Sequence, residues 1–184
     1  LEDKGYNPVV YRFFCLQSHY RKTLTFSFEA LDNATVAYNK LIAKIAALKA
    51  DDSQQTDEAA LEALREKFNK AMCNDLNTSL AITALYDVLK YKTNDKTKLL
   101  LLDEFDQVLS LDLLKAAAEV KKKAEEEAAK KLEGVDPEIL ALVEERTAAK
   151  KAKNFARADE IRDMLKERGI TLKDTPQGVE IIKE

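Results

Sequence analysis

Apolar side chains recur at helical spacing between residues 7 and 114. The longest example is a stripe in which two apolar series each repeat every seven residues, Leu31, Tyr38 and Ile45, and Ala34, Leu41 and Leu48. A helix with such a stripe needs a neighbouring helix to cover it. Shorter helical stripes lie before and after it, formed by Val10, Phe13, Phe14, Leu16, Gln17 and Tyr20, by Leu61, Leu64, Phe68 and Met72, by Leu80, Ala81, Leu85 and Leu89, and by Leu99, Leu102, Phe105 and Leu109.

Residues that favour the start of a helix precede each of these stripes. The predicted starts are Asn7 followed by Pro8, Ser27 with Glu29 in the first turn, Thr56, Asn77 or Thr78, and a break at Thr93 to Asp95. Short connections between amphipathic helices favour antiparallel packing. Only 4 Gly and 3 Pro in 184 residues also favour long helices over a sandwich or barrel. The sequence therefore predicts a mainly α chain that begins with an antiparallel helical bundle.

The pattern changes near the C-terminus. Asn154 can cap a helix, and Gly169 stands where a left-handed residue would end it. The apolar residues of that helix are Phe155, Ala158, Ile161 and Leu165. Ile170 and Leu172 then alternate with polar neighbours, DTPQG supplies turn residues, and residues 179–182 can return as a second strand. We predict a small module of one helix followed by a β-hairpin.

The stretch between these two parts, KAAAEVKKKAEEEAAKKLEG, has alternating charge blocks and few large apolar side chains. Because it cannot bury much surface, we expect a charged linker or a solvated helix. The predicted organisation is a helical bundle over residues 1–114, the linker over 115–135, and the C-terminal module over 136–184.

Charge changes this picture only locally. The net charge is −3, yet residues 146–168 hold eight Lys and Arg against four Asp and Glu. One interpretation is a solvated helix face with ion pairs at four-residue spacing. The other is a surface for RNA, because Phe155 lies among lysines and unpaired bases stack on aromatic rings beside phosphate-binding cations. The ring of Phe155 also suits the core of the module.

Candidate catalytic chemistry is sparse. Cys15 and Cys73 have no metal-ligand or redox spacing, so we expect buried free thiols in a reducing, cytoplasmic compartment. His19 is the sole histidine, and we expect a local capping or packing role for it without a zinc site. There is no Gly-rich phosphate loop, bilayer-spanning apolar run or signal-peptide pattern. The chain begins without an initiator Met, which suggests an excised fragment.

Two strings carry a resemblance to a known family. The run AAKKAKNFARADEIRDMLKERG followed by LKDTPQG resembles the anticodon-binding module of cysteinyl-tRNA synthetases. The string LEDKGYNPVVYRFFCLQSHYRKTLTFSFEAL resembles the segment that follows the ATP-site Lys-Met-Ser-Lys-Ser loop of these enzymes and leads into their DALR-type helical bundle. The central run AMCNDLNTSLAITAL is similar to a further family string, so the resemblance covers nearly all of the chain.

The resemblance implies a set of RNA-binding residues. A basic residue, a stacking aromatic and two carboxylates of the anticodon site correspond to Lys150, Phe155, Asp159 and Asp174. The expected phosphate contacts are Lys151, Lys153 and Arg157. Carboxylates suit base recognition, because they accept hydrogen bonds from the amino group of cytosine or the N–H groups of guanine. The chain departs from the family at Lys150, where many members have Arg, and at Val179, where a Trp is common.

The resemblance also implies an activity for a longer parent protein. Cysteinyl-tRNA synthetases are class I enzymes that use ATP and a zinc ion to join cysteine to tRNA(Cys), with His-Ile-Gly-His and Lys-Met-Ser-Lys-Ser motifs that this sequence lacks. We therefore expect a tRNA(Cys)-binding, anticodon-recognising C-terminal fragment that holds no cofactor and has no catalysis of its own. We expect it to be monomeric, not membrane-bound, and to work beside the N-terminal catalytic domain of the parent.

Three other interpretations stay open. A non-catalytic helical scaffold explains the seven-residue repeats, but it leaves DTPQG and Phe155 among the lysines unexplained. A stand-alone RNA-binding protein derived from the synthetase tail is the second. The third is a related ligase that joins cysteine to an amino sugar, and the C-terminal strings argue against it because such an enzyme has no need of an anticodon module.

Overall fold

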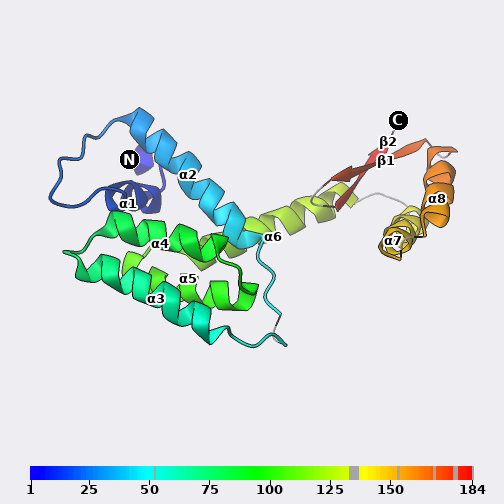
Figure 1. Cartoon of the computed structure of the whole chain (residues 1–184). Helices are drawn as coiled ribbons and strands as arrows, with labels where there is room; N and C mark the ends of the chain where they lie inside the picture. Colours follow the sequence, from blue (N-terminus) through cyan, green and yellow to red (C-terminus); the bar gives the residue numbers. More distant parts are fainter. Residues whose placement is uncertain (52, 133–136, 153, 168, 176–177, 184) are drawn as a thin grey trace. The chain divides into compact units, whose positions relative to one another are not determined.

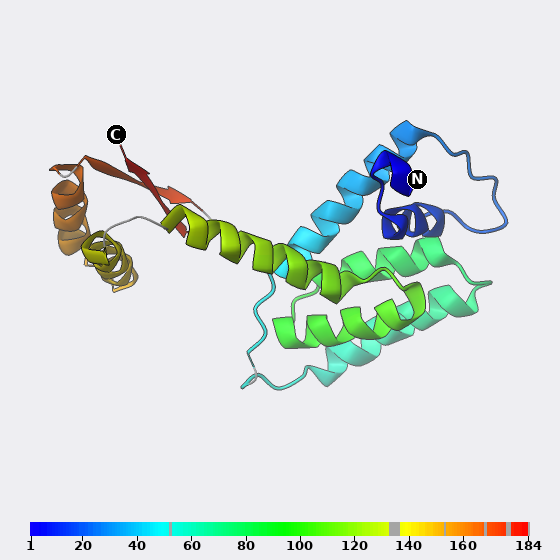
Figure 2. The same ribbon diagram turned by 180° about the vertical axis from the view of Figure 1, so that it is seen from behind.

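The computed structural model describes residues 1–51, 53–132, 137–152, 154–167, 169–175 and 178–183. The chain divides into two units, Leu1–Ala124 and Glu125–Glu184, and helices make up most of each (Figures 1 and 2). The prediction of a mainly α chain with a helical bundle is confirmed. No helix in the described part of the chain is long and apolar enough to cross a membrane.

The first unit contains η1 (Glu2–Lys4), α1 (Pro8–Leu16), α2 (Phe28–Ala46), α3 (Glu58–Cys73), α4 (Thr78–Lys90), α5 (Asp95–Leu109) and the first part of α6 (Leu113–Leu132). The predicted caps at Asn7 and Ser27 are confirmed, because their side chains accept hydrogen bonds from the backbone N–H groups two and three residues later, at 2.9 and 3.1 Å. Of the two alternatives for α4, Asn77 is the cap.

The predicted start of α3 is displaced by one residue, and the predicted first helix is too long at its C-terminal end. Asp57 caps α3 by accepting from the backbone N–H of Ala60 at 3.1 Å, while the Thr56 hydroxyl donates to Glu58. Helix α1 ends at Leu16, so Tyr20 lies beyond it and is exposed. The Tyr20 hydroxyl donates to Asp75 at 2.7 Å. That contact with the turn between α3 and α4 holds this segment outside the helix.

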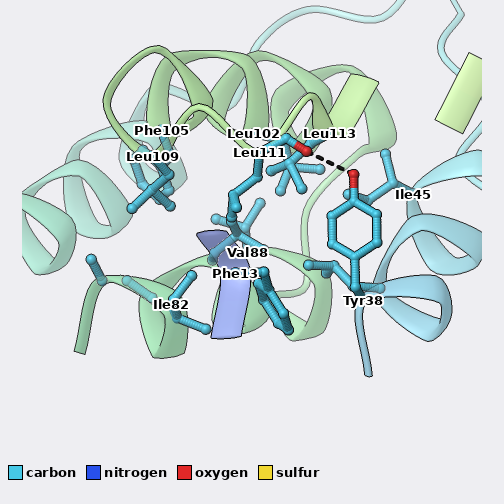
Figure 3. Packing of buried hydrophobic residues seen from close by; sticks show 14 of the residues in the cluster. Phe13, Tyr38, Ile45, Ile82, Val88, Leu102, Phe105, Leu109, Leu111 and Leu113 are labelled. Atoms are coloured by element: carbon cyan, nitrogen blue, oxygen red, sulfur yellow. Dashed lines mark hydrogen bonds between the residues drawn. The ribbon is translucent and has the colours of Figure 1, made fainter. Parts of the chain in front are cut away.

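The predicted stripes build the core of the first unit. Five of the six residues in the seven-residue repeats are at most 4% exposed, namely Leu31, Ala34, Tyr38, Leu41 and Ile45. Figure 3 shows side chains of α2 directed toward those of α5 and the start of α6. Phe68 of α3 and Phe105 of α5 stack with ring centroids 4.1 Å apart. Burial of each large apolar side chain contributes about 1.5–3 kcal/mol, so this cluster drives the folding of the bundle.

The charged stretch after the bundle is helical. It forms most of α6, whose first residues still belong to the core of the first unit, because Leu113 is fully buried and Ala117 is 5% exposed. Residues 118–127 are all exposed, Val120 among them. The structure therefore has a solvated helix here, which was one of the two expected forms.

The second unit contains α7 (Pro137–Lys151), α8 (Phe155–Glu167), β1 (Ile170–Thr175) and β2 (Gly178–Lys183). β1 and β2 pair antiparallel, with Ile170 opposite Lys183 and Thr175 opposite Gly178. Residues 176 and 177 of the expected turn lie outside the described residues. Gly169 has φ +71°, the left-handed conformation predicted at the end of α8.

Helix α7 was not predicted as a separate element of this module. Its apolar residues crowd into its first half, and the string EERTAAKK that follows has no large apolar residue, so the helical period is hard to recognise. The structure shows why the helix is needed. The core of the second unit combines Ile139 of α7 with Ile161 and Leu165 of α8 and Ile170 of β1.

Candidate nucleic-acid interface

Helix α8 begins at the residue that sequence analysis marked as a base-stacking candidate. The Asn154 side chain accepts a hydrogen bond from the backbone N–H of Arg157 at 3.3 Å, and the Asn154 N–H donates to the Ala149 carbonyl of α7 at 2.8 Å. The predicted cap is therefore in place, and Phe155 is the first residue of α8. Lys153, an expected phosphate contact, lies outside the described residues.

Phe155 is not part of the core. Its side chain is 62% exposed, whereas Ala158, Ile161 and Leu165 of the same helix are at most 3% exposed. Successive residues of a helix are turned by about 100°, which places Phe155 roughly 120° from Ile161 around the helix axis. The ring therefore stands beyond the edge of the buried stripe, and of the two roles left open for it, a place in the core is wrong.

The same geometry places three polar residues beside the ring. Phe155, Asp159, Arg162 and Lys166 follow one another at intervals of four, three and four residues and fall within about 60° of arc. All four are exposed. We call these four residues the α8 exposed face. It presents an aromatic ring, a carboxylate, a guanidinium group and an ammonium group in that order along the helix.

Asp159 is held by a neighbour that sequence analysis did not single out. Its Oδ1 lies 2.9 Å from Nη1 of Arg162, and Arg162 also contacts Asp163 at 3.3 Å. Such exposed pairs contribute about 0.2–1 kcal/mol, so they orient side chains more than they stabilise the fold. The signal for Arg162 was the acid–base pair at three-residue spacing.

Arg157 has different partners from the α8 exposed face. Its Nη2 lies 2.8 Å from Oε1 of Glu145 on α7, and its Nη1 lies 3.0 Å from Oε2 of Glu160. The hydrogen bonds to Glu160 and Glu145 raise the pKa of Arg157 above its usual value. At roughly 200° from Phe155 around the helix, this side chain links α8 to α7 and is not brought together with the ring.

The remaining candidates lie on neighbouring elements. Lys150 and Lys151 occupy the last turn of α7, where a positive charge complements the helix dipole, and Lys150 is half-buried. Asp174 lies in β1, opposite Val179 of β2. The structure thus brings together Phe155 and Asp159 on one helix face.

The cysteines, the histidine and the acidic residues do not form a catalytic or metal site in the described part of the chain. Cys15 is half-buried and Cys73 is exposed at the end of α3, so the expectation of two buried thiols is wrong for Cys73. His19 stacks on Tyr20 with centroids 4.9 Å apart and lies 3.7 Å from Asp75. Within the described ranges, no three His, Cys, Asp or Glu side chains gather into a group that could hold a metal ion.

Two family models match this chain. Residues 132–181 match the cysteinyl-tRNA ligase anticodon binding domain, which includes α7, α8 and β1. Residues 67–135 match the DALR domain, which includes α4 and α5 and all of α6. The α8 exposed face therefore lies within the matched anticodon-binding domain.

Curated relatives agree with these matches. Cysteine–tRNA ligase of Brevibacillus brevis is 41% identical over 189 residues, which cover 91% of this chain and 37% of the relative. The corresponding enzymes of Shouchella clausii and Staphylococcus saprophyticus are 39% and 36% identical, over 95% and 96% of this chain. The chain spans 38% and 39% of those two relatives, so it covers less than two fifths of each of the three.

Proposed function

We propose that the chain, which matches two domain models and curated relatives of the cysteine–tRNA ligase family, is the tRNA-binding portion of such an enzyme, with an anticodon-recognising surface on α8. The observation that carries the proposal is the exposure of Phe155 beside Asp159 within the part that matches the anticodon-binding domain. Among the described residues, the buried cluster of the second unit does not include that ring.

The α8 exposed face has suitable chemistry for one unpaired base. The Phe155 ring offers a flat apolar surface, and stacking of a base on an aromatic side chain contributes about 1–3 kcal/mol. Asp159 engages Arg162 through Oδ1, and an ionised carboxylate has about four acceptor positions. A base amino or imino group can therefore donate to Asp159 while Arg162 keeps the carboxylate in place. We propose that Asp174 supplies the second carboxylate.

Phosphate binding is assigned to the lysines at the α7–α8 junction. Lys150, Lys151 and Lys153 would contact the backbone of the anticodon loop and supply the part of the affinity that depends on salt. The Arg157 guanidinium already contacts Glu145 and Glu160, so a phosphate would compete with these two carboxylates for it. We propose that it braces α7 against α8 instead.

For the whole enzyme we propose ligation of cysteine to tRNA(Cys) with ATP, carried out by a catalytic domain that this chain does not contain. In this proposal, ATP and zinc would be held by that catalytic domain. The helical bundle of residues 1–114 would connect to the catalytic domain. Residues 115–135 would act as a spacer, and the module of 136–184 would recognise the anticodon. The partner is tRNA(Cys), and we expect a cytoplasmic monomer.

Backbone amide NMR tests the proposed surface. We expect an anticodon stem–loop RNA with the sequence GCA in its loop to shift the amide signals of α8 and of the end of α7, with smaller effects on α1–α5. The control is the same stem with a loop of different sequence. Shifts confined to the first unit, or none at all, would show that α8 is not the RNA-binding surface and would favour a helical scaffold.

A further inference from the structure

The connection between α5 and α6 is short and fixed by the helix that precedes it. It consists of Ser110, Leu111 and Asp112. The Asp106 carboxylate of α5 accepts a hydrogen bond from the Leu111 N–H through Oδ1 at 2.6 Å and from the Leu113 N–H through Oδ2 at 2.8 Å. Leu113 is the first residue of α6, so the previous helix satisfies one of the N–H groups that a helix start leaves open.

Two other helices donate hydrogen bonds to this connection and to the last residue of α5. The Tyr38 hydroxyl of α2 donates to the Leu111 carbonyl at 2.7 Å, which Figure 3 shows as a dashed line. Nε of Arg12, on α1, donates to the Leu109 carbonyl at 2.6 Å. Leu109, Leu111 and Leu113 are at most 1% exposed. The hydrogen bond between Tyr38 and the Leu111 carbonyl is buried, so water cannot readily replace it, and a buried carbonyl left without a partner is costly.

The backbone of the connection is unusual for its residues. Ser110 has φ +50° and Asp112 has φ +52°, a left-handed conformation that glycine adopts most easily. Residues with a Cβ atom persist in this region when the surrounding structure determines their conformation. Leu111 lies between Ser110 and Asp112. Its hydrogen bonds with Asp106 and Tyr38 hold the backbone in this conformation.

We infer that Asp106 and Tyr38 are positioning residues that fix the direction in which α6 leaves the helical bundle. Helix α6 passes from the first unit into the second, which carries the α8 exposed face. We expect a fixed start of α6 to raise the effective concentration of the recognition module at the anticodon of a tRNA already bound elsewhere on the enzyme. This consequence for tRNA rests on the proposed function, whereas the fixed start of α6 does not.

Spin-label distances test the joint itself. Labels would be placed at Lys40→Cys on α2 and Lys123→Cys on α6, in a chain with Cys15→Ala and Cys73→Ser. We expect Tyr38→Phe and Asp106→Asn each to broaden the distance distribution, while Asp103→Asn, a matched change on the exposed side of α5, leaves it unchanged. Labels at Lys40→Cys and Glu62→Cys, both within the bundle, should keep a narrow distribution in every variant. Unchanged distributions in both joint variants would overturn the inference.

The consequence for tRNA is tested in the full-length ligase. We expect Tyr38→Phe and Asp106→Asn to raise KM for tRNA(Cys) about tenfold. Cysteine-dependent exchange between pyrophosphate and ATP should be unchanged, and so should the affinity for an isolated anticodon stem–loop. If Asp106→Asn fails to fold, Tyr38→Phe decides alone. An unchanged KM overturns the consequence for tRNA, whereas a wild-type protein that does not bind the stem–loop overturns the proposed function instead.

Discussion

A substitution at Phe155 should affect RNA binding without affecting the stability of the fold. Its side chain is 62% exposed and lies outside the core of the second unit, so its removal creates no cavity. We expect Phe155→Ala to weaken binding of the anticodon stem–loop by about 1–3 kcal/mol with an unchanged melting temperature. Met164→Ala is the matched control, because Met164 is also exposed but lies on the opposite side of α8. A fall in melting temperature without a loss of affinity would identify the ring as structural.

Asp159 tests whether the carboxylate recognises a base. We expect Asp159→Ala to leave nonspecific RNA binding intact or strengthen it, because a negative charge is removed. It should reduce the preference for the GCA anticodon by about 1–3 kcal/mol. Asp163→Ala is the control, since Asp163 is exposed and also contacts Arg162. Equal discrimination in the Asp159 variant and the parent protein would make Asp159 a structural partner of Arg162 only. We expect Asp174→Ala to reduce the preference for the GCA anticodon in the same way. Unchanged discrimination in this variant would mean that Asp174 acts only as a hydrogen-bond acceptor in the turn.

For single residues, the sequence predicted helix caps better than it predicted which side chains are exposed to solvent. The caps at Asn7, Ser27 and Asn154 could be predicted because a cap depends on residues within the same turn. The exposure of Phe155 could not, because it depends on where α7 and β1 cover α8, and the spacing of apolar residues alone placed the ring on the buried face. Arg162 was overlooked because a short ion pair on a helix is common and has little specificity.

At the scale of elements, Tyr38 connects α2 to the start of α6 and gives the bundle a dependence on alkaline pH. Burial, followed by the nearby charges of Asp112, Asp106 and Glu119, raises the pKa of Tyr38 to about 12 from 10.0. The folded state therefore holds the phenolic proton more tightly than the unfolded state. Its contribution to stability is complete below pH 10 and is lost as the pH rises through 12.

This loss can be measured by urea unfolding at pH 9 and pH 11.5. We expect the free energy of unfolding of the parent protein to fall by about 2 kcal/mol more than that of Tyr38→Phe over this interval, because the variant has no phenol to ionise. The comparison cancels the titration of the other tyrosines and the lysines. If both proteins lose the same stability, Tyr38 does not retain its proton in the folded state.

The last turn of α7 is the element to which we assign phosphate contacts. We expect Lys150→Ala to weaken binding of all RNAs alike and to reduce the slope of log K against log salt by about one. Lys44→Ala, an exposed charge at the end of α2 in the first unit, should leave the slope unchanged. A sequence-dependent loss with an unchanged slope would mean that Lys150 contacts a base and not a phosphate.

Helices in which apolar residues recur at regular helical spacing could be predicted from the sequence, whereas a helix without that spacing could not. The stripes of α2–α5 could be read from the sequence because each of these helices buries one face in a shared core. Helix α7 was overlooked because its burial rests on few residues, chiefly Ile139. The contacts at the α5–α6 connection could not be predicted from the sequence either, because those to Leu109 and Leu111 join residues 97 and 73 positions apart.

At the scale of the whole molecule, the chain combines a bundle that matches the DALR domain in part with a module that matches an anticodon-binding domain. Helix α6 runs from one unit into the other. The similarity to cysteine–tRNA ligases could be recognised from the strings at the two ends of the sequence. Nothing in the sequence marks Asp106 as more important than the other carboxylates of α5, because its role comes from a backbone that turns back toward it.

The most direct test of the central claim is the ratio of two dissociation constants for this chain, one for tRNA(Cys) and one for a copy with a single anticodon base changed. The ratio would be measured across a salt series, so that phosphate binding and base recognition are separated. We predict that both affinities fall with salt while the ratio stays at about 5- to 150-fold, which corresponds to roughly 1–3 kcal/mol. Equal dissociation constants at every salt concentration would contradict anticodon recognition by this chain.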